Sequence, residues 1–145
     1  MESATSSATR VMKTMDVGGC IEKLEPYVKN NFRALLFLMA LTGYGRARVI
    51  SGVRTLEFQK RLYGKGRNKE ECWEAGVPKE YAAPAMDQVT WSLPEESKHV
   101  HALAIDVDLS MYRDIVWGEI GHLAATCGLN WGGEWRVKDY GHFEL

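Results

Sequence analysis

The sequence predicts a single compact α+β domain in which helices pack against a small antiparallel sheet. Three observations favour this class. An early segment has apolar residues at helical spacing, short β-branched segments follow it, and no internal repeat is visible. A chain of 145 residues can also bury enough surface for one hydrophobic core without disulfides.

Residues 1–16 are rich in Ser, Thr and Ala and are predicted to be a mobile tail, because few apolar side chains could offset the entropy of ordering. The predicted domain is therefore 17–145. Segment 25–45 is predicted to be a helix, with Pro26 in its first turn and Gly43 near its end. Its apolar positions recur at helical spacing and predict the main core helix: Phe32, Leu35, Leu36 and Met39.

The middle of the chain alternates between strand and helix patterns. The β-branched run at 47–52 predicts a buried strand, and 55–64 returns to helical spacing. Residues 64–88 contain glycines, prolines and charged residues and are predicted to be a long loop with a turn of helix inside it. Long loops in compact domains are often functional, so this loop is a candidate wall of a binding groove.

The C-terminal third is predicted to contain a strand at 103–109 and a helix from Tyr112 to about Cys127. Ser110 is the predicted cap of this helix and Gly128 its stop. A short strand is expected at the C-terminus. The predicted inner face of the helix consists of Ile115, Val116, Ile120, Leu123 and Cys127.

Composition argues against several classes of partner. Lys and Arg number 18 against 19 acidic residues, so no global field attracts nucleic acid or an anionic membrane. The longest apolar run, 34–41, is far below the ~20 residues that span a bilayer, and no secretory signal is visible. Cys20, Cys72 and Cys127 are widely spaced and favour a reducing compartment over a disulfide framework. We expect a monomer without stable membrane insertion.

Two segments carry candidate metal ligands. "SKHVHALAIDV" (97–107) contains His99, His101 and Asp106, and "DYGHFEL" (139–145) supplies Asp139 and His142. Two histidines and one carboxylate are a common catalytic zinc set that leaves a fourth position for water. The spacing differs from the helical HExxH pattern, so the side chains could converge only through folding of strands.

On the residues alone, several structural interpretations compete with a metal site. A histidine on an apolar background is often a satisfied core residue. His101 is the alternative ligand if the strand register differs, since it would face the same side as His99. His122 is expected to be structural, and Asp108 is either a supporting carboxylate near Asp106 or a solvated one.

The order of several motifs resembles a known family. These are "SGVRTLEFQ" (51–59), "LYGKGR" (62–67), "VTW" (89–91), "SKHVHALAIDV" (97–107), "WGGEW" (131–135) and "DYGHFEL" (139–145). The chain resembles the zinc D-Ala-D-Ala carboxypeptidase and L-alanyl-D-glutamate peptidase family over about residues 48–145, and among its members the short phage endolysins most of all. The resemblance implies a Hedgehog/DD-peptidase-like fold.

One position departs from the signature S-x-H-x-x-G-x-A-x-D of that family. Ser97, His99, Ala104 and Asp106 match it, whereas Ala102 stands at the glycine position. If that residue adopts a positive φ, a Cβ there costs on the order of 1 kcal/mol or more. No ligand is removed, so we expect a small local adjustment.

The resemblance implies roles for five residues. His99, Asp106 and His142 would bind zinc. Asp139 matches the catalytic acidic position, where it would take a proton from the attacking water and pass it to the leaving amine. Arg54 matches the arginine that steadies the developing oxyanion. Without the resemblance, Arg54 would be interpreted as a surface cation and Asp139 as the cap of a turn.

Four further residues are candidate substrate contacts. The resemblance suggests that Gln59 and Ser97 orient the substrate or the groups around the metal. Trp131 and Trp135 flank a glycine pair in "WGGEWR". They are either core aromatics beside a turn or the wall of a substrate groove, and the glycines would allow the backbone to approach a ligand closely.

The resulting functional hypothesis is a zinc endopeptidase that cuts the peptidoglycan stem peptide between L-Ala and D-Glu. As a phage-type lysin it would accumulate in the host cytoplasm and reach the wall after a holin opens the membrane. One alternative is a D-Ala-D-Ala carboxypeptidase or dipeptidase, whose members commonly carry E-x-W-H where this chain has Asp139-Tyr140-Gly141-His142. The other is a zinc-containing binding module without catalysis.

Overall fold

The computed structural model describes residues 2–145 and confirms the α+β class. In this part of the chain it contains five α-helices and one four-stranded sheet. The chain divides into two compact units, which are described separately. The first unit comprises the residues up to Val53 together with Ala102–Leu145, and the second unit comprises Arg54–His101.

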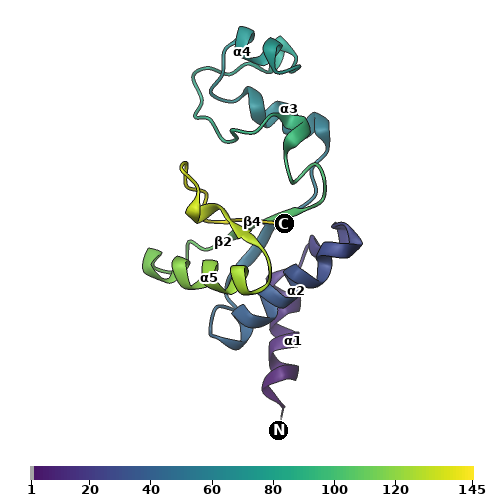
Figure 1. Cartoon of the computed structure of the whole chain (residues 1–145), viewed down its shortest axis with the longest axis vertical. Helices are drawn as coiled ribbons and strands as arrows, with labels where there is room; N and C mark the ends of the chain where they lie inside the picture. Colours follow the sequence, from purple (N-terminus) through teal and green to yellow (C-terminus); the bar gives the residue numbers. More distant parts are fainter. Residues whose placement is uncertain (1) are drawn as a thin grey trace. The chain divides into compact units, whose positions relative to one another are not determined.

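The sheet belongs to the first unit, and every neighbouring pair of its strands is antiparallel. The strands are β1 (Arg48–Ser51), β2 (Ala104–Asp108), β3 (Asn130–Trp131) and β4 (His142–Glu144), in the order β1-β2-β4-β3. The strands predicted near 47–52, 103–109 and the C-terminus are confirmed. The first was predicted to be buried, but in β1 only Val49 is buried and Ile50 is 66% exposed. Two β-branched segments and the C-terminal segment thus come together although they are far apart in the sequence (Figure 1).

The two faces of this sheet differ in chemistry, because successive residues of a strand point to opposite sides. Ile105, Val107 and Phe143 are buried in the hydrophobic core. Two helices that contribute to this core, α2 (Pro26–Leu41) and α5 (Asp114–Thr126), lie on the same side of the sheet (Figure 1). The alternate residues on β2 and β4, which carry the polar side chains, therefore occupy the opposite face.

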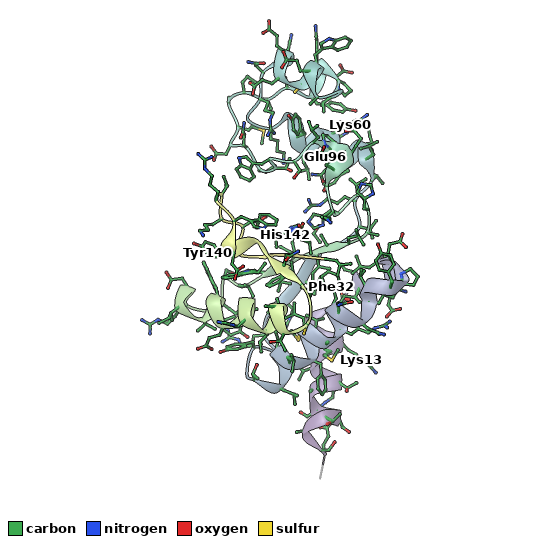
Figure 2. All side chains as sticks on the ribbon, viewed as in Figure 1. Lys13, Phe32, Lys60, Glu96, Tyr140 and His142 are labelled. Atoms are coloured by element: carbon green, nitrogen blue, oxygen red, sulfur yellow. The ribbon has the colours of Figure 1, made fainter. Side chains whose placement is uncertain are left out.

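Helix α2 confirms the predicted core helix. Pro26 stands in its first turn, and Gly43 follows its end with a φ of 95°. A glycine adopts this left-handed conformation without steric cost, which explains why the helix stops there. The four predicted core residues Phe32, Leu35, Leu36 and Met39 are all buried, and Figure 2 labels Phe32 among them.

The N-terminal segment differs from the expected mobile tail. Residues Ala4–Met15 form helix α1. Ser3 is its N-cap, and the Ser3 side chain accepts a hydrogen bond from the backbone N–H of Ser6. Ala8 is 3% and Met15 is 1% exposed, and Met15 belongs to the hydrophobic core. The composition pointed to disorder because only a few apolar residues are present, but these few lie on one face of a helix that packs on α2.

The structure corrects two details of helix α5. The helix begins at Asp114 with Arg113 at the N-cap, so Ser110 lies too early in the sequence to be its cap. The Ser110 N–H donates to the Asp108 carboxylate in the turn after β2. Ile115 was predicted to face inward but is 80% exposed. The buried face is formed by Ile120, Gly121 and Ala124, with Val116, Leu123 and Cys127 packed beside it.

The second unit contains the predicted helix after β1 and the long segment that follows it. Helix α3 (Leu56–Gly64) begins at Thr55, whose hydroxyl accepts a hydrogen bond from Phe58 N–H, and helix α4 (Lys69–Glu74) has a complete capping box. The expected helical element within 64–88 is therefore confirmed. Tyr63, Cys72 and Val77 form a small separate core. Two 3-10 helices complete the unit, η2 (Lys79–Tyr81) and η3 (Pro94–Glu96).

A buried arginine connects the parts of this second unit. Arg67 is 6% exposed, its Nη1 donates to the Tyr63 carbonyl at 2.7 Å, and its Nη2 donates to the Thr90 carbonyl at 2.8 Å. The guanidinium also lies 3.7 Å from the centre of the Tyr63 ring. Arg67 of the "LYGKGR" motif therefore holds the chain near Thr90 against helix α3.

Within residues 2–145, none of the helices combines the length and the apolar character that crossing a membrane requires.

Candidate metal centre

The centre of the polar sheet face is a pair of directly opposed residues on β2 and β4. Asp106 and His142 are register partners, as are Ile105 and Phe143 one position away. His142 Nδ1 lies 3.2 Å from Asp106 Oδ1. The prediction that His142 is brought to Asp106 on a neighbouring strand is therefore confirmed, and the pairing of two short strands is what brings them together.

A third polar residue lies on the same face. Glu144 is two residues after His142, so both side chains leave β4 on one side. Its Oε2 lies 2.7 Å from His142 Nε2. The imidazole is 8% exposed and is held between two carboxylates, one at each nitrogen.

This arrangement controls the protonation of His142. Burial lowers the pKa of the imidazole, but the hydrogen bonds to Asp106 and Glu144 and the charges of these carboxylates raise it more, to about 9. With both ring nitrogens protonated, the imidazolium donates one hydrogen bond to each carboxylate. In the absence of a metal, the surrounding negative charge therefore favours the protonated, cationic form of His142.

The geometry of the pair also fits two ligands of one small metal ion. Tetrahedral zinc with bonds of about 2.0–2.2 Å to nitrogen and oxygen separates neighbouring ligand atoms by roughly 3.3 Å. The observed 3.2 Å between His142 Nδ1 and Asp106 Oδ1 agrees with this separation. Among the described residues, those that could together hold a metal ion are His99, Asp106 and His142, each offering one ligand atom.

Asp139 lies in the loop just before β4. Its backbone N–H donates to the Gly132 carbonyl at 3.0 Å, and its own carbonyl accepts from His142 N–H at 3.2 Å. A Cβ on Gly132 would come within 2.3 Å of the Asp139 carbonyl oxygen. The glycine therefore permits a close approach that holds Asp139 next to the start of β4.

Trp131 contributes mainly to packing. It is partly buried, its Nε1 donates to the Tyr140 carbonyl at 2.7 Å, and its ring occupies the space above Gly121 and Gly133. A Cβ on either glycine would approach the indole to 2.2 Å. Gly121 and Gly133 thus provide room for this tryptophan, which supports the core interpretation of Trp131. Its predicted contact with substrate stays a prediction.

Trp135 has a different position. Its ring centre lies 4.8 Å from that of His142, with the planes inclined by 48°, and 36% of its surface is exposed. It packs against an imidazole of the candidate site while one part remains accessible to solvent. Contact with a bound substrate is still a prediction for Trp135, and this position is compatible with it.

His99 and Ser97 lie in the second unit, in the turn after η3. Both are buried, with 4% and 6% exposure. The Ser97 carbonyl accepts from the N–H groups of Val100 and His101, which closes the turn. His99 is therefore presented by a tight turn before β2, so the condition under which His101 would share a strand face with it is not met.

Arg54 and Gln59 belong to the same unit as His99, although they are far from it in the sequence. The Arg54 N–H donates to the His99 carbonyl at 3.1 Å, so the backbone at Arg54 is tied to the turn. Arg54 Nη1 donates to Gln59 Oε1 at 3.4 Å. Gln59 is 1% exposed on α3 and its Nε2 donates to the Thr90 hydroxyl at 3.4 Å. Gln59 thus orients the Arg54 guanidinium, a support that the sequence did not identify.

Ala102, which stands at the glycine position of the family signature, adopts a positive φ. Ala102 has a φ of 59°, and no other non-glycine residue among 2–145 has a positive φ. Its carbonyl accepts from Glu25 N–H at 3.1 Å, which connects this position to the start of α2. The alanine therefore occupies a left-handed conformation that a glycine would adopt more easily.

The alternative candidates have other surroundings in the structure. His101 is exposed, lies in the turn with its Nε2 2.6 Å from the Glu95 carbonyl oxygen, and therefore does not share a strand face with His99. His122 is exposed on α5, so it is not a core residue. The Asp108 carboxylate accepts from Ser110 N–H at 2.9 Å. Hydrogen bonds from the side chain and then the backbone of Ser110 lower the pKa of Asp108, which gives it a role in the turn after β2.

Sequence reasoning missed Glu144 and Gly132. The signal for Glu144 was available, because its spacing of two from His142 on a strand puts both on one face. The role of Gly132 depends on its approach to Asp139, seven residues later, which no local pattern indicates.

Comparisons with known proteins give three findings. The D-alanyl-D-alanine carboxypeptidase family matches residues 91–145. Peptidoglycan L-alanyl-D-glutamate endopeptidase CwlK of Bacillus subtilis (strain 168) is 32% identical over 138 residues, which cover 84% of this chain and 73% of that protein. The crystal structure of Serratia marcescens L-Ala D-Glu endopeptidase ChiX matches with a TM-score of 0.49 and 19% identity, over 97% of this chain and 87% of that chain.

Proposed function

The chain belongs to the D-alanyl-D-alanine carboxypeptidase family of metallopeptidases, and from this premise we propose that it is a zinc-dependent endopeptidase that hydrolyses the L-Ala–D-Glu bond of the peptidoglycan stem peptide. The observation that carries the proposal is the register pair of Asp106 and His142, with nitrogen and oxygen donors at a separation suited to one metal ion. The choice of bond is supported by the activity for which the relative CwlK is named, peptidoglycan L-alanyl-D-glutamate endopeptidase.

The proposed ligands are His99, Asp106 and His142. Two imidazoles and one carboxylate match the donor types of catalytic zinc sites and leave one position for a water. Zinc bound there supplies a Lewis acid and lowers the pKa of a coordinated water to about 7. The donor set would also accept other divalent ions, so the choice of zinc rests on the family resemblance and on these ligand types.

Asp139 is the proposed general base. In this role its carboxylate takes a proton from the attacking water and delivers it to the leaving amine nitrogen of D-Glu. The loop held by Gly132 and the adjacent His142 N–H supports the assignment, because it fixes the backbone of Asp139 close to a proposed ligand. Arg54 is proposed to stabilise the oxyanion that develops on the L-Ala carbonyl, with its guanidinium oriented by Gln59.

The test of activity is mass spectrometry of peptidoglycan fragments after incubation with the protein. We expect release of a new D-Glu amino terminus, loss of this product with a chelator, and its recovery on addition of zinc. Loss of terminal D-Ala alone would instead establish the carboxypeptidase alternative, which the family match over residues 91–145 makes the second candidate. Absence of any cleavage by zinc-loaded protein would favour a binding module.

The test of the ligands is the zinc content of purified variants. His142→Ala should lose stoichiometric zinc, whereas the matched variant His122→Ala, altered at an exposed histidine on α5, should retain it. Stoichiometric high-affinity zinc in His142→Ala would contradict the proposed ligand set.

We also propose a phage-lysin role, in which the enzyme stays in the host cytoplasm until a holin opens the membrane. The support is the resemblance of the motifs to those of short phage endolysins. Expression in a Gram-negative host should cause lysis only together with a holin. Lysis by the enzyme alone, at equal expression, would contradict this route.

A further inference from the structure

Glu144 is a carboxylate on the polar sheet face that has no role in the proposed reaction, and it contacts the proposed ligand His142 directly. Its Oε2 lies 2.7 Å from His142 Nε2, and its side chain is only 18% exposed. A hydrogen bond to a carboxylate at this distance, largely shielded from water, is among the strong ones.

The sheet register explains how Glu144 reaches the imidazole. On β4 the two side chains are separated by one residue and point to the same face. The register partners of Glu144 are Ala104 on β2 and Asn130 on β3. Because Ala104 carries only a methyl group, the carboxylate has no bulky side chain directly opposite on β2 and can extend along its own strand towards His142.

The contact determines which nitrogen of the ring is available. A neutral imidazole carries one proton, and an acceptor at Nε2 retains that proton there. The lone pair is then at Nδ1, the nitrogen that lies 3.2 Å from Asp106 Oδ1. Glu144 is at the opposite nitrogen of the ring from Asp106, so it is placed to support His142 and not to share its metal ion.

We propose that Glu144 is a positioning residue that holds the Nε2–H tautomer and the ring orientation of His142, so that Nδ1 is presented to the metal. This inference rests on the proposed metal site. Histidine ligands commonly donate their second N–H to a carboxylate, and loss of such a partner weakens metal binding about 10–100-fold.

The experiment measures the zinc dissociation constant by competition with a chromophoric chelator. Four proteins are compared: the unaltered chain, Glu144→Ala, Glu144→Gln and Glu70→Ala, the last removing an exposed glutamate from α4. We expect Glu144→Ala to bind zinc about 10–100-fold more weakly. Glu144→Gln should recover most of this loss, because its amide oxygen still accepts the Nε2–H, and Glu70→Ala should match the unaltered chain.

A second measurement reports the tautomer directly. Long-range proton–nitrogen NMR spectra of the zinc-loaded protein should show His142 with its proton on Nε2 in the unaltered chain and in Glu144→Gln. Glutamine fills nearly the same volume as glutamate, so recovery of zinc affinity does not by itself distinguish the acceptor from packing. The nitrogen signature makes this distinction, because it reports which ring nitrogen of His142 carries the proton. If Glu144→Ala fails to fold, the signature and the affinity of Glu144→Gln still decide the matter.

The outcomes separate this inference from the proposed metal site. Zinc binding by the unaltered chain with unchanged affinity in Glu144→Ala would overturn the role of Glu144 and leave the metal site intact. A metal-bound Nε2 would also overturn it. Failure of the unaltered chain to bind zinc would overturn the metal site and the inference together.

Discussion

The backbone of Asp139 is held against Gly132 by a hydrogen bond of 3.0 Å from the Asp139 N–H to the Gly132 carbonyl. The approach is so close that a Cβ on Gly132 would lie 2.3 Å from the Asp139 carbonyl oxygen and 3.1 Å from its Cβ. Position 132 therefore tolerates no side chain unless the segment carrying the proposed base moves.

Gly132→Ala should reduce hydrolysis while zinc remains bound. A displacement of the base by about 1 Å can lower the rate about 100-fold, and none of the proposed ligands is altered. The measurement is kcat/KM on a stem-peptide substrate, with zinc content determined on the same samples. Gly118→Ala is the matched control, because a Cβ at this helical glycine meets nothing within 4 Å. Equal activity of the two variants would show that the loop adjusts without consequence.

Asp139→Asn should abolish most of the activity and leave the metal in place. The amide is nearly the same size as the carboxylate but cannot accept a proton, and general-base catalysis contributes about 10²–10⁴-fold. Hydrolysis and zinc stoichiometry should be measured together. A variant that retains full hydrolysis would require another base, and one that loses zinc would place Asp139 among the ligands.

Ala102→Gly should stabilise the protein slightly. Relief of the left-handed alanine at a φ of 59° gains about 1–2 kcal/mol, and the greater freedom of glycine in the unfolded chain offsets about 0.4–1 kcal/mol. Chemical denaturation should therefore show a gain of up to about 1.6 kcal/mol. Ala125→Gly, at an exposed position within α5, should instead lose about 1 kcal/mol. A loss at both positions would mean that Ala102 is not strained.

The metal-free protein should become less stable as the pH rises through 9. The pKa of His142 is about 9 in the folded chain against 6.5 when unperturbed, so the folded state holds a proton that the unfolded state releases earlier. The stabilisation is fully present below about pH 6.5, is lost as the pH rises through about 9, and is on the order of 3 kcal/mol. Urea unfolding with a chelator at pH 6 and pH 9.5 measures it.

Other groups also titrate over this range, so the matched variant His142→Gln provides the reference. The difference in unfolding free energy between the two proteins should shrink as the pH rises from 6 to 9.5. A difference that stays constant would show that His142 does not carry a proton between Asp106 and Glu144.

The C-terminal half of the chain shows how far local patterns extend. Alternation at 103–109 predicted strand β2 and put Asp106 on the face opposite Ile105, because a period of two is a property of the strand itself. The alternation does not extend to His99 and His101, which lie in a turn closed by the Ser97 carbonyl, so no strand period indicates where their side chains point. Ile115 was wrongly assigned to the inner face of α5. Periodicity indicates which residues of a helix share a face, but the elements that pack on the helix decide which residues are covered.

By itself the sequence determined the residue types at the site, the order of the motifs, the main helix α2 and the strands on which Asp106 and His142 lie. These properties follow from chemistry and periodicity along the chain. Only the tertiary structure decided that Asp106 faces His142, that Glu144 lies at the other nitrogen of the imidazole, and that Gly132 holds Asp139. The physical reason is that register and close approach depend on the pairing of segments remote in sequence, where a shift of one residue would turn every side chain to the other face.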